Sequence, residues 1–347
     1  MNTFLRTFLA CRVHSGKRQQ CWIVAALVVP LMCAASFAET CRSGTDLDDA
    51  TRSALTTAAL HDFDLIAKGD TASLRQNAAP SLTSDFSGIE SVVKNDQATL
   101  SGTKATPRPP FLLEAEGAAP IANAEFYCGV FGASGQTANS AVFYLGNLNP
   151  GKYGVVILDA PTSKGPYTVS LILQQQGADW KLAGLYIKAR QFAGHDSAWF
   201  TSQAQQYQSK GQAHNAWLYY FEARALSSPL PFMSTAVTDK LYDESQKALP
   251  SDFPADGKTV DFSAGGTSYK LLELYPDPVG SNLDLIVKYQ MADVSNTNHA
   301  YDSNVALMKA LLAKYPELRD AFATVVARAV EPGGRDYGTM LAIKDIK

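Results

Sequence analysis

The stretch YGVVILDAPTSKGPYTVSLILQQQGADWKLAGLYIKA, residues 153–189, contains three runs of β-forming residues separated by two turn signals. The turn signals are PTSKGP and QGAD, which combine glycine or proline with short polar residues. Links this short favour antiparallel pairing, because parallel strands need a crossover of a dozen or more residues. The stretch therefore predicts an antiparallel sheet.

The residues before this stretch predict three more strands and, earlier still, helices. PFLLEAE (110–116), AEFYCGVF (124–131) and AVFYLGN (141–147) alternate β-forming residues with turn signals. Residues 47–79 instead place Leu55, Ala59 and Phe63 at helical spacing. Asp46 is expected to cap the first helix, Gly69 to end it and Asp70 to cap a second helix.

A helix, the pair Gly69-Asp70, a further helix and antiparallel strands closing on DWKLAGLYIKA (179–189) resemble the nuclear transport factor 2 superfamily. The resemblance covers residues 47–195. It implies a cone-shaped α+β fold, in which a curved sheet wraps round helices and often leaves a pocket at its open end. Members of the superfamily include enzymes and plain binding or dimerisation modules, so the resemblance does not choose a function.

Residues 196–250 are predicted to be helical. Large and small residues alternate through 197–229 in a series that resembles a single tetratricopeptide repeat: Phe200, Ala204, Tyr207, Gly211, Ala216, Tyr220, Ala223 and Pro229. STAVTDKLYDESQKAL (234–249) follows as a third, amphipathic helix. Repeat arrays need three or more units, and no second copy of the series occurs at a period near 34. We therefore expect a structural helical hairpin; the alternative is a groove that binds a partner peptide or assembles an envelope complex.

The segment PSDFPADGKT (250–259) is rich in proline and aspartate and is typical of a linker. Beyond it, residues 258–347 predict a small β-β-α-β-β domain. Its strands are TSYKLLELY (267–275), NLDLIVKYQ (282–290), FATVVARAV (322–330) and YGTMLAIKDI (337–346), and its helix is SNVALMKALLAKY (303–315) with Asp302 or Ser303 as the cap. For 322–330 a continued helix is the alternative.

Residues 1–38 are typical of an export signal. Four basic residues and no acidic residue precede the apolar run CWIVAALVVPLMCAA (21–35). The small residues Ser36 and Ala38 occupy the two positions that signal peptidase recognises. Cleavage is expected after Ala38, with export to the periplasm or outside the cell. The alternative is an inner-membrane anchor formed by residues 22–38, because the apolar run lies at the short end of what spans a bilayer.

The charge and cysteine content bound the class of partner. The formal net charge of −3 becomes −7 once the four positive charges of residues 1–38 are removed. No basic stripe remains, so a nucleic-acid partner is excluded and a membrane is approached only through an uncleaved leader. Of five cysteines, Cys41 and Cys128 lie outside the leader. They form either one disulfide, as exported proteins often do, or two separate thiols.

The common catalytic, phosphate-binding and metal-binding motifs do not occur, so the sequence predicts no catalytic residue, no metal site and no cofactor. His61, Asp62 and Asp64 come nearest to a metal-ligand set, and a solvated helix face is the favoured interpretation of them.

A ligand pocket in the first domain would be walled by tyrosines. Strand alternation places Tyr127 on the same face as Glu125 and opposite Phe126. Tyr144 and Tyr186 are expected to join Tyr127 on a concave face, because a hydroxylated aromatic ring suits a largely apolar pocket. Ordinary sheet packing is the alternative.

Together these features predict an exported α+β protein that binds or scaffolds, with another protein or a small apolar ligand as its partner. The alternative function is an enzyme of hydrolase or isomerase type that uses the cone pocket. Its mark would be a carboxyl or imidazole group inside that pocket with a raised pKa.

Overall fold

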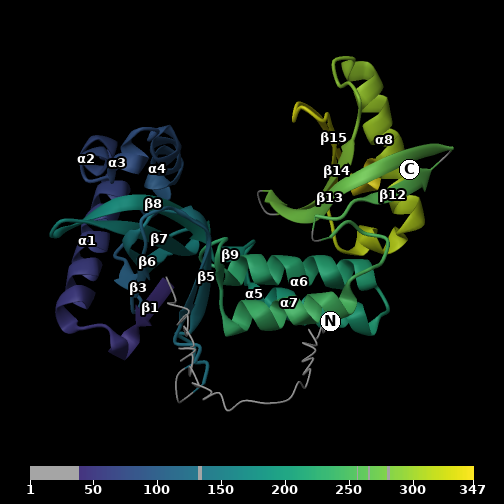
Figure 1. Ribbon diagram of the computed structural model, residues 1–347. Helices are drawn as coiled ribbons and strands as arrows, with labels where there is room; N and C mark the ends of the chain where they lie inside the picture. The colour runs from purple at the N-terminus through teal and green to yellow at the C-terminus, as the bar shows by residue number, and fades with distance from the viewer. Residues whose placement is uncertain (1–38, 132–134, 256, 265, 280–281) are drawn as a thin grey trace, which may run out of the picture. The chain divides into compact units, whose positions relative to one another are not determined.

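The computed structural model describes residues 39–347 apart from 132–134, 256, 265 and 280–281 (Figure 1). The predicted leader, its cleavage after Ala38 and the alternative anchor at 22–38 all lie outside these residues. Within the described part of the chain, no helix has both the length and the apolar character needed to cross a membrane. Helices and strands occur in comparable amounts, which confirms the α+β class.

Four helices precede the main strands: α1 (Asp49–Lys68), α2 (Thr71–Gln76), α3 (Pro80–Thr83) and α4 (Ser87–Leu100). Gly69 ends α1 in the left-handed conformation, with φ 73°, which glycine adopts without steric cost. Asp70 accepts a hydrogen bond from the backbone of Ser73 and caps α2, as expected. The prediction of Asp46 as the first cap is wrong, because α1 begins later and Asp48 caps it through the Thr51 N–H.

Two antiparallel sheets follow instead of one. The larger has the order β1-β3-β6-β7-β8, with the short β2 paired to β6; the smaller has the order β11-β5-β4. Their strands are β1 (Glu39–Ser43), β2 (Thr106–Pro107), β3 (Phe111–Ala115), β4 (Ile121–Cys128), β5 (Ala141–Leu148), β6 (Gly151–Thr162), β7 (Gly165–Gln176), β8 (Asp179–Ala189) and β11 (Met233–Ser234). A two-residue pair, β9 (Gln191–Phe192) and β10 (His195–Asp196), closes the segment. The stretch 153–189 therefore forms the predicted antiparallel strands β6, β7 and β8.

These elements form three layers. Helices α1 and α4 lie on one face of β6, β7 and β8 (Figure 1), and the small sheet packs on the opposite face. Leu55, Phe63 and Leu158 fill the layer between helices and sheet and are almost fully buried. Phe126 and Phe143 fill the layer between the two sheets. Packed side chains thus occupy the space beneath α1 and α4.

A disulfide between Cys41 and Cys128 joins the two sheets. Cys41 lies on β1 of the larger sheet and Cys128 on β4 of the smaller one, and the Cα atoms are 5.1 Å apart. The bond therefore links layers that share no hydrogen-bonded strand pair.

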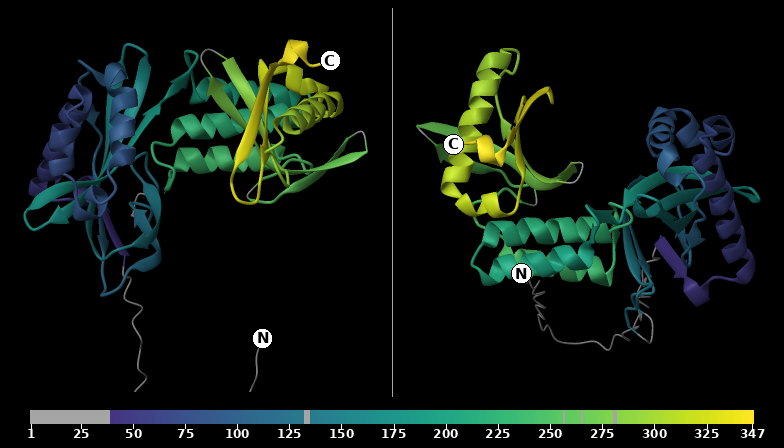
Figure 2. Two further views of the ribbon diagram at one scale, coloured as in Figure 1. Left: turned by 90° about the horizontal axis from the view of Figure 1, so that it is seen from above. Right: turned by 180° about the vertical axis from the view of Figure 1, so that it is seen from behind.

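Three helices lie side by side in the next segment (Figures 1 and 2): α5 (Ser197–Ser209), α6 (Ala213–Ser227) and α7 (Ala236–Ala248). Asp196 caps α5 through the Trp199 N–H, and Thr235 caps α7 in a capping box. Helix α6 is buried on nearly every side, which means that both of its neighbours contribute to its stability.

The C-terminal segment contains one more strand than predicted. Its elements are β12 (Val260–Ala264), β13 (Thr267–Val279), β14 (Asn282–Gln290), α8 (Thr297–Lys314), a 3-10 helix (Pro316–Asp320), β15 (Thr324–Val330), β16 (Asp336–Ala342) and a last 3-10 turn (Ile343–Asp345). The sheet order is β12-β13-β14-β15-β16, and only β14 and β15 are parallel. Residues 324–330 are a strand, not a continued helix. Helix α8 begins six residues before the expected start, and Asn296 caps it in place of Asp302 or Ser303.

The helical segment and the C-terminal sheet share one hydrophobic core. Two tyrosines of the stretch 197–229 anchor it, Tyr207 of the repeat-like series and Tyr219 beside it. The Tyr207 hydroxyl donates to the Asp320 carbonyl at 3.2 Å, and the Tyr219 hydroxyl donates to the Ala321 carbonyl at 2.9 Å. Nearby, the buried Asn215 side chain donates to the Glu317 carbonyl at 2.6 Å. One face of the α5–α6 pair is therefore covered by the chain's own C-terminal segment.

Candidate functional site

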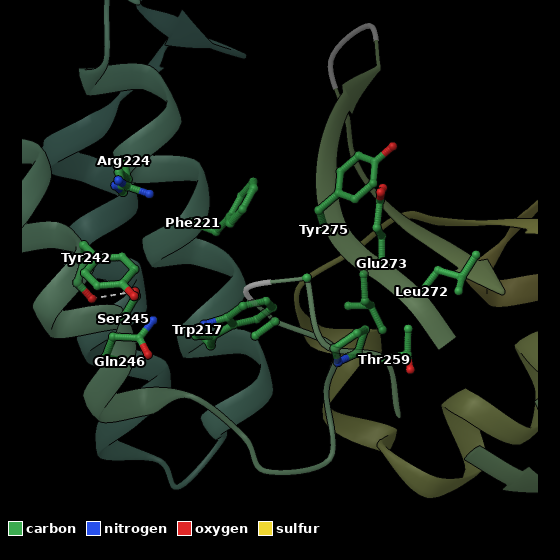
Figure 3. A pocket seen from close by; sticks show the side chains of 14 residues that line it. Trp217, Phe221, Arg224, Tyr242, Ser245, Gln246, Thr259, Leu272, Glu273 and Tyr275 are labelled. Carbon is green, nitrogen blue, oxygen red and sulfur yellow. Dashed lines mark hydrogen bonds between the residues drawn. The ribbon is translucent and has the colours of Figure 1, made fainter. Parts of the chain in front are cut away.

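An aromatic cleft lies between helices α6 and α7 on one side and strand β13 on the other (Figure 3). Its volume is about 510 Å³. Pro254 and Thr259, from the segment 250–259 between α7 and β12, also line the cleft. Pockets for small organic ligands commonly have volumes of roughly 300–1,000 Å³, so the cleft has room for one such molecule.

The helical wall of the cleft is built by residues at positions i, i+4 and i+7 of α6. Trp217, Phe221 and Arg224 share one face of the helix because of this spacing. Trp217 is nearly buried and packs edge-on against Phe253, with ring centroids 6.2 Å apart. The centroid of the Phe221 ring lies 6.2 Å from that of Trp217, but the Phe221 side chain stays 43% exposed. An anchored ring thus supports a second ring that remains open to a ligand.

The opposite wall comes from β13, where a bulge shifts the register between Leu271 and Glu273. Tyr275 and Glu273 face Phe221 across the cleft (Figure 3). The Lys288 ammonium forms an ion pair with the Glu273 carboxylate, with Nζ and Oε2 2.7 Å apart, and it also lies 5.4 Å from the centroid of the Tyr275 ring. The strand wall therefore holds an aromatic ring beside an ion pair.

Helix α7 contributes Tyr242, and the Arg224 guanidinium lies over its ring at 5.1 Å from the centroid. This cation–π contact holds Arg224 at the rim of the cleft. The Ser245 hydroxyl, also in the lining, donates to the Tyr242 carbonyl at 2.7 Å. The Ser245 hydroxyl is therefore engaged with the helix backbone, and the cleft presents aromatic rings together with the polar groups of Arg224 and Glu273.

Three buried carboxyl groups, Glu222, Asp62 and Asp284, have raised pKa values because burial disfavours their charged forms, and none of them lines the aromatic cleft. Burial raises the pKa of Glu222 on α6 to about 7, against the opposing effect of the nearby Lys188 ammonium. Lys188 donates hydrogen bonds to the carbonyls of Ala225 and Ser228, at the carboxyl end of α6. Lys188 therefore stabilises the end of the helix.

The second such group is Asp62 on α1, whose pKa burial raises to about 6. Asp62 accepts a hydrogen bond from the Asn77 amide at 2.5 Å, and Asn77 in turn accepts one from Lys181 at 3.2 Å. His61 and Asp64 are exposed, as expected for a solvated helix face, but Asp62 beside them is buried because the loop after α2 folds over it. The group ties that loop to β8.

The three tyrosines expected to wall a pocket do not meet in one cavity. Tyr127 and Tyr144 are 44% and 49% exposed, and the Tyr127 hydroxyl donates to Glu125 at 2.5 Å. Phe126 and Phe143 lie on the buried face of the small sheet. Tyr127 and Tyr144 lie on its opposite face and are exposed to solvent. Tyr186 lies instead on β8, where it lines a separate cavity between the two sheets.

A further cavity of about 750 Å³ lies between α5 and α7. Short polar side chains such as Ser197, Thr201 and Ser202 form its α5 wall. Val237 on α7 is its most exposed apolar residue, at 58%.

Sequence reasoning missed the aromatic cleft. Its helical wall lies within the repeat-like stretch, but its strand wall comes about 50 positions later in the chain. The available signal was the apolar character of α6 on all sides, which implies that a second element packs beyond the repeat partner. Comparison with family models, with characterised proteins and with solved structures finds no match for this chain.

Proposed function

We propose that this chain is an exported binding protein that takes one small, largely apolar molecule in the cleft between α6 and β13. The observation that carries the proposal is the ring of Phe221, which stays 43% exposed between Trp217 and Tyr275 in a cavity of about 510 Å³. A half-exposed phenylalanine ring beside other aromatic rings gains free energy when an apolar ligand removes it from water. The Cys41–Cys128 disulfide supports export, because such bonds persist in oxidising compartments.

The proposal includes the finer fold assignments. Residues 47–195 form a divergent member of the nuclear transport factor 2 superfamily, supported by α1, the Gly69-Asp70 junction and the antiparallel strands β6–β8. Residues 197–229 form a single tetratricopeptide-like hairpin that works as a structural joint. The contacts of Tyr207 and Tyr219 with the C-terminal segment support that role.

Binding is favoured over catalysis because none of the buried carboxyls with raised pKa values, Glu222, Asp62 and Asp284, lies in the cleft. Glu222 lies beside Lys188, and Asp62 lies under Asn77. A small ligand is favoured over a protein partner because α6, α7, the linker and β13 all border the cleft.

The test is a fluorescence titration of the mature protein with N-phenyl-1-naphthylamine, a neutral apolar probe that brightens on leaving water. We expect saturable binding, quenching of Trp217, and a roughly tenfold weaker affinity for Phe221→Ala, as expected from the loss of a phenyl contact area. Tyr301→Ala is the matched control, since the Tyr301 ring is 44% exposed, as Phe221 is at 43%, but lines none of the cavities described above. Absence of saturable binding, or equal affinities of the Phe221→Ala variant and the parent protein, would refute the proposal.

A further inference from the structure

A cavity of about 430 Å³ lies between the two sheets of the N-terminal part, away from the aromatic cleft. It is bordered by the end of β5, by β7 and by β8. Tyr186 of β8 packs edge-on against Phe232, with ring centroids 5.4 Å apart, and Ile172 of β7 lies beside them. These side chains give the cavity an apolar wall.

The remaining lining is rich in carboxamides and contains no charged side chain. Four amides line it: Asn147, Asn149, Gln174 and Gln176. Three other cavities of this protein, by contrast, include arginine, lysine or acidic side chains in their walls. An ionic ligand would find no counter-charge here, so the lining chemistry selects a neutral one.

The amides also have hydrogen-bonding capacity to spare. The Gln174 amide donates to the Tyr153 hydroxyl at 3.3 Å, and that hydroxyl donates to the backbone carbonyl of Asn149 at 2.8 Å. Each primary amide offers two N–H donors and a carbonyl acceptor, so most of this capacity is left for a ligand. A purely apolar ligand would strip water from these amides without replacing its hydrogen bonds, which costs free energy.

We propose that this cavity binds a neutral saccharide. Sugar hydroxyls both donate and accept, which matches planar amides, and the C–H face of a sugar ring matches the apolar wall of Tyr186 and Phe232. Glycoside cleavage normally requires a pair of carboxylic acids, and the lining holds none, so the site binds and does not hydrolyse. The proposal is independent of the apolar cleft and its ligand.

The experiment titrates the mature protein with maltotriose, cellotriose and N,N′,N″-triacetylchitotriose by isothermal calorimetry and by NMR, with trigalacturonate as an anionic control. Sedimentation with insoluble cellulose and chitin separates a free oligosaccharide from a polymeric glycan as the source. We expect saturable binding of at least one neutral trisaccharide or glycan and none of trigalacturonate. Failure of every neutral probe, or preference for trigalacturonate, would overturn the proposal.

Variants locate the binding. Asn147 has a left-handed backbone, φ 54°, so Asn147→Gly removes the amide without straining the chain. Combined with Gln176→Ala it should weaken saccharide binding about tenfold or more, since two amide contacts are lost. Gln175→Ala is the matched control, because alternation points Gln175 to the opposite face of β7. Unchanged affinity in the double variant would refute the site. Phe221→Ala should leave saccharide binding intact, which separates this proposal from the apolar cleft.

Discussion

Breaking the Cys41–Cys128 disulfide should cost this protein a large part of its stability. The bond closes a loop spanning 87 positions, and the chain-entropy model assigns a loop of that length roughly 4.5 kcal/mol of constraint on the unfolded chain. Folded domains are stable by only about 5–15 kcal/mol, so the loss is a substantial fraction of the total. The effect should fall mainly on the packing of the small sheet against the larger one, because no strand pair joins them.

The assay is urea unfolding of the mature protein with and without a reductant, followed by circular dichroism and by the fluorescence of the nearly buried Trp180. Comparing oxidised with reduced protein isolates the cross-link, because no side-chain atoms are removed. Cys41→Ala alone is the control. It leaves Cys128 in its buried place and should match the reduced parent protein.

Two results would refute this reasoning. One is a free energy of unfolding that changes by less than about 1 kcal/mol on reduction, far below the loop estimate. The other is an intact mass of the protein that reveals two free thiols.

Three further predictions concern other residues. Burial raises the pKa of Glu222 to about 7, so the folded protein keeps a proton that the unfolded chain releases near pH 4.5. The free energy of unfolding should therefore fall by up to about 3 kcal/mol as the pH rises from about 4.5 to 7. Glu222→Gln should flatten this pH dependence in urea melts, and an unchanged slope would contradict the burial of the charge. Gly154→Ala should destabilise the protein by about 1–3 kcal/mol, because the new Cβ would collide with the buried Leu55 side chain, whereas Gly88→Ala in open space on α4 should be neutral or stabilising. Equal melting temperatures for the two variants would argue against this packing. Tyr207→Ala should cost about 3–5 kcal/mol, since it removes a buried ring and its hydroxyl contact; a fully stable variant that loses only a binding partner would show a docking role instead.

The local structure of this chain could be read from sequence because short-range rules determine it. Gly69 ends a helix and Asp196 begins one because their backbone and side-chain chemistry act within a few residues. The ends of helices were less predictable where several capping residues compete. Asp48 displaced Asp46, and Asn296 displaced Asp302 and Ser303, since each choice depends on where the neighbouring chain packs.

The candidate sites were less predictable, because alternation along a strand defines two faces without saying which is buried. On β4 both faces carry aromatic side chains, and the structure buries Phe126 and exposes Tyr127. Of the tyrosines expected to wall a pocket, only Tyr186 lines a cavity described here. The aromatic cleft was missed because Phe221 and Tyr275 come from segments far apart in sequence.

By itself the sequence determined the α+β class, the antiparallel strands of 153–189 and the helical character of 196–250. These depend on periodicity, turn residues and composition, which act locally. Only the tertiary structure decided that the strands divide into two sheets, that Asp62 is buried, and that Phe221 faces Tyr275 across a cleft. Such features depend on contacts between distant segments, whose free energy comes from burial and packing and leaves no mark in the local pattern of residues.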